Sequence, residues 1–324
     1  SFGSCIILYE GSPFYPNEDS LLKTMDSINL RIFGTSAKYI SYLQTNNIVP
    51  KDIGSFKSLR LILSTGSPLE DSSFDFVYNY WKDDVQLSSI SGGTDIISCF
   101  ALGNPNLPVY RGELQCLGLG MSVKSYDKKG NHNFLQKGEL ICDKAFPSMP
   151  IYFWGDKGNK KYLDAYFSDY NNKWKHGDFI LINYKYGVKI FGRSDSTLNP
   201  GGIRIGTAEI YQALNSLKYI KDSLVVGQIK DKDERIILFV ILNNDIDFDF
   251  NIKEEIKMKI RNYCSPKHVP SIILSVEDIP YTMNGKKVEV AIKKIINGFE
   301  VDNKESLANP ESLELFKNIE ELRI

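Results

Sequence analysis

The chain has 324 residues, of which 42% are hydrophobic, 24% charged and 12% aromatic. This composition is typical of a soluble globular protein, and the length predicts two domains, one large and one small. The net charge of −1 argues against nucleic acid or an anionic membrane as the main partner. No apolar run reaches the roughly 20 residues that a membrane helix needs.

The cysteines and histidines argue against two kinds of site. Five cysteines are scattered without a C-x-x-C pair, which favours reduced thiols in a cytoplasmic protein over a disulfide framework or a zinc site. The three histidines are far apart, so a histidine-based metal site is not expected. The sequence begins at Ser1 without a signal-peptide pattern, and the apolar run 5–9 predicts a strand. We therefore expect the chain to begin inside a sheet of a longer protein.

The first expected elements alternate between helix and strand. Residues 30–44 have apolar side chains at helical spacing and predict a helix, in which Ser36 and Lys38 are interpreted as surface residues rather than ligands. A short apolar run at 59–63 predicts a buried strand, and residues 70–81 predict a helix.

The loop after that strand contains Gly66, Ser67 and Pro68. It leaves the carboxyl end of a strand, which is where α/β sheets place their ligands. An ordinary strand–helix turn is the alternative.

A second loop follows an expected strand at 85–90 and reads SGGTD over residues 91–95. The hydroxyl of Thr94 and the carboxylate of Asp95 together suit a hard cation that bridges phosphates, because Mg²⁺ prefers oxygen ligands and keeps several waters. This loop is therefore a candidate phosphate and Mg²⁺ site.

A region dense in glycine and proline, residues 107–157, predicts a small β subdomain with a strand at 138–142. It leads to an HGD sequence that contains His176 and Asp178. A carboxylate can accept hydrogen bonds from both ribose hydroxyls at once, so Asp178 is the candidate ribose ligand, whereas His176 is interpreted as structural.

The stretch after an expected strand at 187–191 combines arginines with glycines. Arg193 and Arg204 flank a turn that contains Gly201 and Gly202. Guanidinium groups suit phosphate or ribose oxygens, and glycines let a backbone approach a bulky ligand. A solvated hairpin with two surface arginines is the alternative.

From Asp195 onward the pattern predicts a compact α+β unit, so we expect domains at 1–194 and 195–324 with a hinge at Asp195. Helices are expected at 207–217 with Thr207 as cap, 251–263, 287–297 and in the tail after 301, and strands at 223–229, 235–242 and 269–276. A turn, PYTMNGKK, places Lys286 on an exposed tip, as any Asn-Gly-Lys hairpin would, and Lys287 is its main competitor for a catalytic role.

Four stretches together resemble the adenylate-forming superfamily, which includes acyl-CoA synthetases, luciferases and peptide-synthetase adenylation domains. They are SGGTD, HGD, GRSD with its GGIR turn, and PYTMNGKK, in the family's order. The stretches FGTSAKYI, STGSPL, LPVYRGELQ, FPSMPI, WKHGDF and SPKHVP extend the resemblance over nearly the whole chain. It implies an α/β adenylate-forming fold: part of a large AMP-binding domain, then a small α+β C-terminal lid. The family's upstream phosphate loop is not found, which implies the C-terminal half of an enzyme.

The resemblance also implies roles for the candidate residues. Gly66, Ser67 and Pro68 would line the adenine pocket, Asp178 and Arg193 would hold the nucleotide, and Thr94 would contact the α-phosphate. Asp95 would hold Mg²⁺ directly or through a water, since the family usually has the longer glutamate there. Lys286 and Arg204 would supply positive charge, and Gly201 and Gly202 would line the CoA path.

The implied reaction is that of an ATP-dependent acid–thiol ligase with ATP, Mg²⁺ and CoA. A carboxylate attacks the α-phosphate to give an acyl-AMP and pyrophosphate, and the CoA thiol then displaces AMP. Acetate-activating relatives have a tryptophan near Gly92 and Gly93. The glycines therefore either leave room for acetoacetate or only serve the turn. Alternatives are another short acid (acetate, propionate or 3-hydroxybutyrate), a peptide-synthetase-like module, and an inactive nucleotide-binding fragment.

Overall fold

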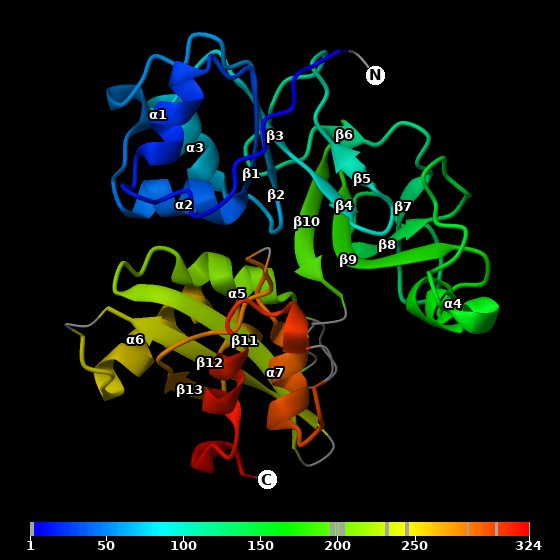
Figure 1. The fold of residues 1–324 in the computed structure, drawn as a ribbon. Helices are drawn as coiled ribbons and strands as arrows, with labels where there is room; N and C mark the ends of the chain where they lie inside the picture. The colour runs from blue at the N-terminus through cyan, green and yellow to red at the C-terminus, as the bar shows by residue number, and fades with distance from the viewer. Residues whose placement is uncertain are drawn as a thin grey trace.

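The computed structural model describes residues 3–194, 198, 200, 205–230, 233–243, 246–283, 285–301 and 304–323. The helices and strands form a first part, residues 3–194, and a second part, residues 205–323, which lies beneath the first in Figure 1. Within these ranges no helix is both long and apolar enough to cross a bilayer.

The first part opens with a parallel α/β unit. Its elements, with η for a 3₁₀ helix, are α1 (Ser20–Ser27), β1 (Ile32–Ser36), α2 (Ala37–Thr45), η1 (Pro50–Asp52), β2 (Leu61–Thr65), α3 (Asp71–Tyr80) and β3 (Gln86–Ser89). The strands pair in parallel in the order β1-β2-β3, and the three helices lie on one side of them in Figure 1. Parallel strands need such crossover helices, whose apolar faces form the core with the sheet.

The predicted helix at 30–44 is wrong in its first half. Ile32–Ser36 is strand β1, which pairs in register with β2 from Ile32↔Leu61 to Ser36↔Thr65. Helix α2 begins only at Ala37, where the Ser36 hydroxyl accepts a hydrogen bond from the Tyr39 amide (3.2 Å) and caps the helix. Pairing with a distant strand prevails here over the local helical spacing.

The rest of the first part is rich in antiparallel strands, as predicted for 107–157. Its elements are β4 (Ser91–Gly93), β5 (Ser98–Leu102), β6 (Cys116–Leu117), β7 (Val123–Tyr126), β8 (Gly138–Cys142), η2 (Lys157–Asn159), α4 (Lys160–Tyr166), β9 (Trp174–Ile182) and β10 (Val188–Arg193). They form two sheets, β4-β5-β6 and β10-β9-β8-β7. The two sheets share one apolar core, in which Phe100, Phe146 and Trp174 are buried.

The second part is a three-stranded sheet covered on both faces. Its elements are α5 (Thr207–Leu214), β11 (Ile220–Lys230), β12 (Asp233–Leu242), α6 (Phe250–Tyr263), η4 (Pro266–His268), β13 (Ile272–Ser275), α7 (Glu289–Ile296), η5 (Lys304–Ser306), η6 (Pro310–Phe316) and η7 (Glu320–Leu322). Along β12, Leu238 packs with α5 and α6, whereas Phe239 packs with α7 and the tail. This alternation follows from the two faces of a strand, and it confirms the predicted α+β unit.

Two details of the second part differ from the prediction. Thr207 is the first, buried residue of α5 rather than its cap, which is Gly206. The tail after 301 forms short 3₁₀ helices instead of an α-helix. Phe316 is buried edge-on against Phe239, with 4.8 Å between the ring centroids, so the tail conforms to the apolar surface beneath it.

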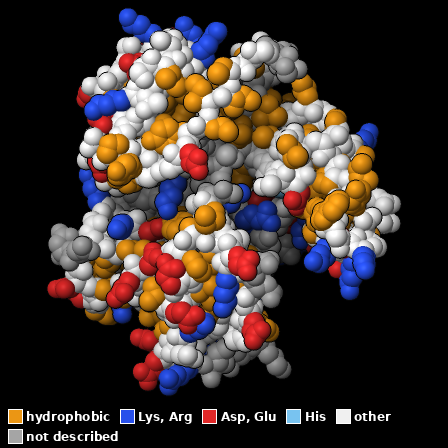
Figure 2. All heavy atoms as spheres, in the orientation of Figure 1, with side chains coloured by type: hydrophobic (Ala, Val, Ile, Leu, Met, Phe, Trp, Pro, Cys, Tyr) orange, Lys and Arg blue, Asp and Glu red, His pale blue; other side chains and the backbone are white. Residues whose placement is uncertain are grey.

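The predicted strand at 5–9 is not formed. The segment is extended but pairs with no strand among the described residues, and Ile6 and Leu8 are 82% and 88% exposed. Figure 2 shows apolar side chains gathered on this upper face, over the region of the N-terminal segment and β1–β3 in Figure 1. Exposed apolar surface of this kind is typical of an interaction face or of an aggregation-prone segment.

Candidate active site

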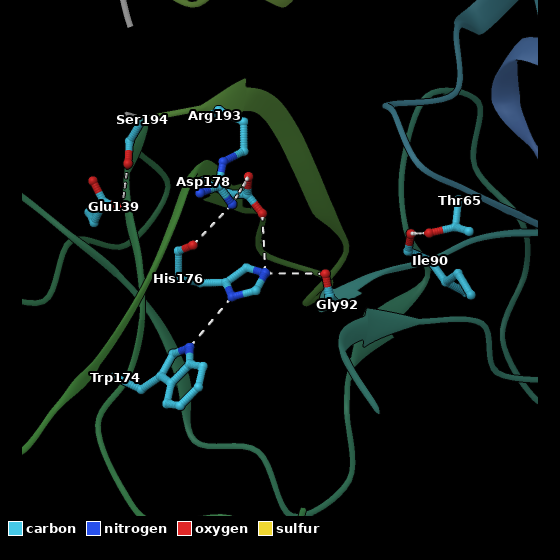
Figure 3. A network of polar contacts seen from close by, with 9 residues as sticks. All are labelled: Thr65, Ile90, Gly92, Glu139, Trp174, His176, Asp178, Arg193 and Ser194. Carbon is cyan, nitrogen blue, oxygen red and sulfur yellow. Dashed lines mark hydrogen bonds and ion pairs between the residues drawn. The ribbon is translucent and has the colours of Figure 1, made fainter. Parts of the chain in front are cut away.

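The carboxyl ends of β2 and β3 bring the two predicted loops together. These strands are parallel neighbours, and the Thr65 hydroxyl donates to the Ile90 carbonyl oxygen (3.2 Å), which joins the start of one loop to the end of the other strand (Figure 3). Gly66 has a φ of +93°, which glycine adopts without strain. The loop with Gly66, Ser67 and Pro68 and the SGGTD loop therefore leave the same edge of the sheet, as expected.

Asp178 and Arg193 face each other on neighbouring strands. They are registered partners of β9 and β10, and Arg193 Nη1 lies 3.7 Å from Asp178 Oδ1. Arg193 also donates to the His176 carbonyl oxygen (3.2 Å). A Cβ at Gly177 would lie 2.8 Å from Arg193 Nη2, so only a glycine lets the guanidinium lie against this strand. The Asp178 side chain is largely buried, whereas that of Arg193 is about half exposed.

His176 links these two residues to the SGGTD loop (Figure 3). The Trp174 indole N–H donates to His176 Nδ1 (3.4 Å). Because the indole can only donate, Nδ1 accepts and the proton of a neutral ring lies on Nε2. Nε2 is then the donor to the Gly92 carbonyl oxygen (3.2 Å), and it lies 3.6 Å from Asp178 Oδ2. Buried His176 thus holds the candidate ribose carboxylate next to the candidate phosphate loop.

The two glycines of that loop are explained by packing. A Cβ at Gly92 would lie 1.9 Å from the Ser98 carbonyl oxygen, and a Cβ at Gly93 would lie 3.0 Å from His176 Cε1. Neither direction opens into free space, so the geometry favours the alternative in which the glycines serve the local backbone rather than an acyl pocket.

We expect Gly92→Ala to destabilise the protein by about 1–3 kcal/mol, because the methyl group pushes β4 from β5. The matched control is Gly34→Ala on β1, where a Cβ would meet no atom within 4 Å. We expect the control to change the unfolding free energy by less than ~0.5 kcal/mol. Urea unfolding of both variants measures the difference, and equal effects would contradict the packing explanation.

Thr94 and Asp95 are exposed, and Asp95 has a partner that the sequence did not predict. The Tyr166 hydroxyl donates to the Asp95 carboxylate, and the Tyr166 ring stacks on Trp174 with 3.6 Å between centroids. Burial and this hydrogen bond raise the pKa of Tyr166. Tyr166 lies on α4 (Lys160–Tyr166), far from Asp95 in the sequence.

A Mg²⁺ ion at this loop would have few protein ligands. The described residues contain no group of three or more histidine, cysteine, aspartate or glutamate side chains that could hold a metal. Asp95 with the Thr94 hydroxyl nevertheless fits Mg²⁺, because this ion is often held by one or two carboxylates together with substrate phosphates and waters.

The two candidate lysines of the second part, Lys286 and Lys287, differ in their contacts. Lys287 Nζ lies 2.9 Å from Asp222 Oδ1, donates to the Ser223 carbonyl oxygen and lies over the Tyr211 ring. Burial raises the pKa of Asp222, but Lys287 and Tyr281 outweigh burial and the net pKa is lowered. The Lys286 side chain is exposed on the same turn. The geometry therefore favours Lys286 as the lysine available to a ligand.

A cavity of about 670 Å³ lies between the two parts, which is the usual size of a small-molecule site. Its lining includes Pro68, Ser89 and Ile190 from the first part and Gln212 from α5. Pro68 is one of the predicted adenine-pocket residues. Another hollow, of about 680 Å³ around Phe14, contains none of the predicted site residues.

Three of the predicted residues, Gly201, Gly202 and Arg204, and the predicted hinge residue Asp195 lie outside the described residues. Of the other predicted residues, Gly92, Gly93, Asp178 and Arg193 lie around His176. Gly66, Ser67 and Pro68 lie on the loop after β2.

A cluster of Glu209, Lys137 and His268 joins the two parts near this cavity. Glu209 of α5 pairs with Lys137 of the first part, and Glu209 Oε2 lies 3.0 Å from His268 Nε2. Burial raises the pKa of Glu209, but the hydrogen bonds from His268 and Lys137 outweigh it and hold the pKa at about 2.

This depressed pKa predicts a pH-dependent contribution to stability. The contribution is complete above the ordinary pKa of 4.5 and is lost as the pH falls toward 2, because the unfolded state takes up the proton first. We expect Glu209→Gln to lower the unfolding free energy by about 3 kcal/mol at pH 6 but by only about 1 kcal/mol at pH 3. Urea unfolding at both pH values measures this. The control is Glu254→Gln in an exposed pair with Lys257, and an equal slope there would contradict the assignment.

Comparisons with known proteins show relatives of the same kind as the sequence motifs predict. Residues 209–286 match the family model of the AMP-binding enzyme C-terminal domain. The chain is 48% identical over 321 residues to acetoacetyl-coenzyme A synthetase of Rhizobium meliloti, covering 99% of this chain and 49% of the relative. It is 45% identical over 323 residues to acetoacetyl-CoA synthetase of Gallus gallus, covering 99% of this chain and 48% of the relative.

Solved structures agree with these relatives. Acetoacetyl-CoA synthetase from Streptomyces lividans matches with a TM-score of 0.88 and 37% identity, over 95% of this chain and 48% of that one. An anthranilate CoA ligase in complex with anthranoyl-AMP matches with a TM-score of 0.72 over 88% of this chain and 53% of that one. At 18% identity, it shows a shared fold alone.

The chain therefore shares the α/β fold of the adenylate-forming family, and residues 209–286 match its C-terminal domain. The chain is similar over nearly its whole length to acetoacetyl-CoA synthetases. The chain spans about half the length of the curated relatives it matches.

Proposed function

We propose that the protein to which this chain belongs is an ATP-dependent ligase that joins acetoacetate to CoA, with acetoacetyl-AMP as intermediate. The observation that carries the proposal is the connection of Asp178, Arg193 and the SGGTD loop through His176. The chain that contains this arrangement is itself 48% identical to an acetoacetyl-coenzyme A synthetase. ATP and CoA are the co-substrates of this reaction.

The proposed nucleotide contacts are divided among the strand ends. Asp178 would accept hydrogen bonds from the ribose hydroxyls, and Arg193, 3.7 Å away, would orient that carboxylate. Gly66, Ser67 and Pro68 would line the adenine pocket, and Thr94 would donate to the α-phosphate. Asp95 would hold Mg²⁺, which neutralises phosphate charge when it is bound.

The proposed chemistry depends on positive charge, because an anionic carboxylate must approach a polyanionic nucleotide. Lys286 and Arg204 would supply this charge in the first half-reaction. Gly201 and Gly202 would line the path of the CoA thiol in the second. The exposure of Lys286 and the engagement of Lys287 with Asp222 support this division of roles.

We place the domain boundary between residues 194 and 195, with a hinge at Asp195 between domains 1–194 and 195–324. The apolar core clusters support this boundary, since each lies wholly before residue 191 or after 197. Ser194 is held to the first part by its amide to the Gly177 carbonyl oxygen and its hydroxyl to Glu139, both at 2.7 Å. Rotation of the second part would thus be absorbed after Ser194. A cytoplasmic location belongs to the same proposal.

The test measures pyrophosphate release by the protein extended to the length of its relatives. Acetoacetate, acetate, propionate and 3-hydroxybutyrate are each supplied with ATP and Mg²⁺, and we expect the fastest release with acetoacetate. Faster release with another acid would reassign the substrate. If calorimetry shows AMP binding but no acid gives pyrophosphate release, the result would favour a nucleotide-binding protein without ligase activity. This is the second candidate function, because the chain matches only about half of its relatives' length.

A further inference from the structure

One contact joins the turn that carries Lys286 to the first part of the molecule. The ammonium of Lys38, the second residue of α2, lies 3.5 Å from the centroid of the Tyr281 ring. Such a cation–π contact is attractive because the ring face carries negative charge. Lys38 is exposed overall, but its ammonium is partly shielded from water at this contact.

The Tyr281 ring is held firmly within the second part. Its hydroxyl donates to the Asp222 carboxylate, and its amide donates to Asn309 Oδ1 (2.8 Å). Its carbonyl oxygen accepts from the Ala308 amide (2.8 Å). These bonds leave the ring little freedom, so Lys38 meets a surface of fixed orientation.

The same turn transmits this orientation to Lys286. Tyr281 forms an isolated β-bridge with Lys287, and the Thr282 amide donates to the Lys286 carbonyl oxygen (2.9 Å). The Lys286 amide in turn donates to the Thr282 hydroxyl (3.1 Å). A displacement of the Tyr281 ring would therefore move the backbone of Lys286 with it.

The charges around the contact also favour it. Asp222 is paired with Lys287 in the second part, and Lys38 approaches the same group from the first part. Partial desolvation has the largest effect on Lys38 and lowers its pKa. Asp222 and Asp278 act in the opposite direction, whereas Lys287 acts with desolvation.

We propose that Lys38 is a positioning residue: by contacting the Tyr281 ring, it docks the turn that carries Lys286 against the first part. The consequence for catalysis rests on the proposed function, but the docking itself does not.

The experiment measures the docking equilibrium of the 324-residue chain without nucleotide or acid. Spin labels are attached through non-canonical residues at two exposed positions, Lys57 and Met258, and the distances between them are recorded. The urea concentration is set so that the docked and undocked populations are equal in the parent. We expect Lys38→Met to lower the ratio of docked to undocked protein roughly two- to thirtyfold.

Three comparisons decide the outcome. Lys38→Arg should restore the ratio because a guanidinium also binds a ring face, and Tyr281→Leu should lower the ratio with no further loss on adding Lys38→Met. Lys51→Met removes a cation–π contact with Tyr80 inside the first part and should change nothing. A ratio unaffected by Lys38→Met, no restoration by arginine, or fully additive losses would each overturn the proposal. The acid panel above is independent of all three results.

Discussion

Replacing Lys286 by alanine is expected to slow pyrophosphate release by about 10²–10³-fold in the protein extended to the length of its relatives. The reason is electrostatic, since removal of one preorganised donor to a transition state of high negative charge costs roughly 3–4 kcal/mol. Lys286 is exposed, and its side chain makes no hydrogen bond or ion pair with the described residues. The thermal midpoint should therefore stay unchanged.

Lys287→Ala is the matched control, one residue away on the same turn. This substitution leaves Asp222 without its 2.9 Å ion pair, which should lower the unfolding free energy by roughly 2–3 kcal/mol. Pyrophosphate release by the folded fraction should stay near that of the parent. The opposite pattern, with a stable but slow Lys287→Ala and an unaffected Lys286→Ala, would assign the role to Lys287.

Asp178→Asn in the same extended protein is expected to raise the dissociation constant of AMP roughly 10- to 100-fold. Asparagine keeps the shape of the side chain but removes the charge that would strengthen hydrogen bonds from the ribose hydroxyls. It also removes the anionic partner of Arg193. Calorimetric titration with AMP measures the change.

Asp169→Asn is the control for this prediction. Asp169 pairs with Lys175, which lies on β9 like Asp178. The Asp169 side chain is half exposed and is not part of the candidate site. AMP binding should be unchanged in this variant. If both variants bind AMP as the parent does, Asp178 is not the ribose ligand, and equal weakening in both would indicate a general effect of surface charge.

Much of this fold follows from local patterns in the sequence. The apolar runs that became β2, β3 and β8 were predicted within a few residues because each is short, apolar and bounded by turn residues. The failures are cases in which distant contacts decide. β1 was predicted as helix because its pairing with β2 cannot be seen in its own spacing, and the tail follows the surface against which Phe316 packs.

In the candidate site, too, the residues recognised by local motifs were predicted, whereas those that act through distant contacts were not. Motif order predicts Asp178, Arg193, Thr94 and Asp95 as site residues, because the side chains themselves carry the chemistry. Trp174 and Tyr166, which donate hydrogen bonds to His176 and Asp95, were not predicted. Tyr166 is 71 residues from Asp95 in the chain, and no local pattern connects them. The tautomer of His176 likewise depends on the indole of Trp174, a relation that only the folded chain shows.

The extended run around Ile6 has a practical consequence for handling the chain in solution. Ile6 and Leu8 present apolar side chains next to backbone amides and carbonyls that no neighbouring strand among the described residues pairs. Such a segment is a template for intermolecular β-pairing, and at high concentration copies of the chain are expected to aggregate through it. Dilute samples are therefore the suitable starting condition for the measurements above.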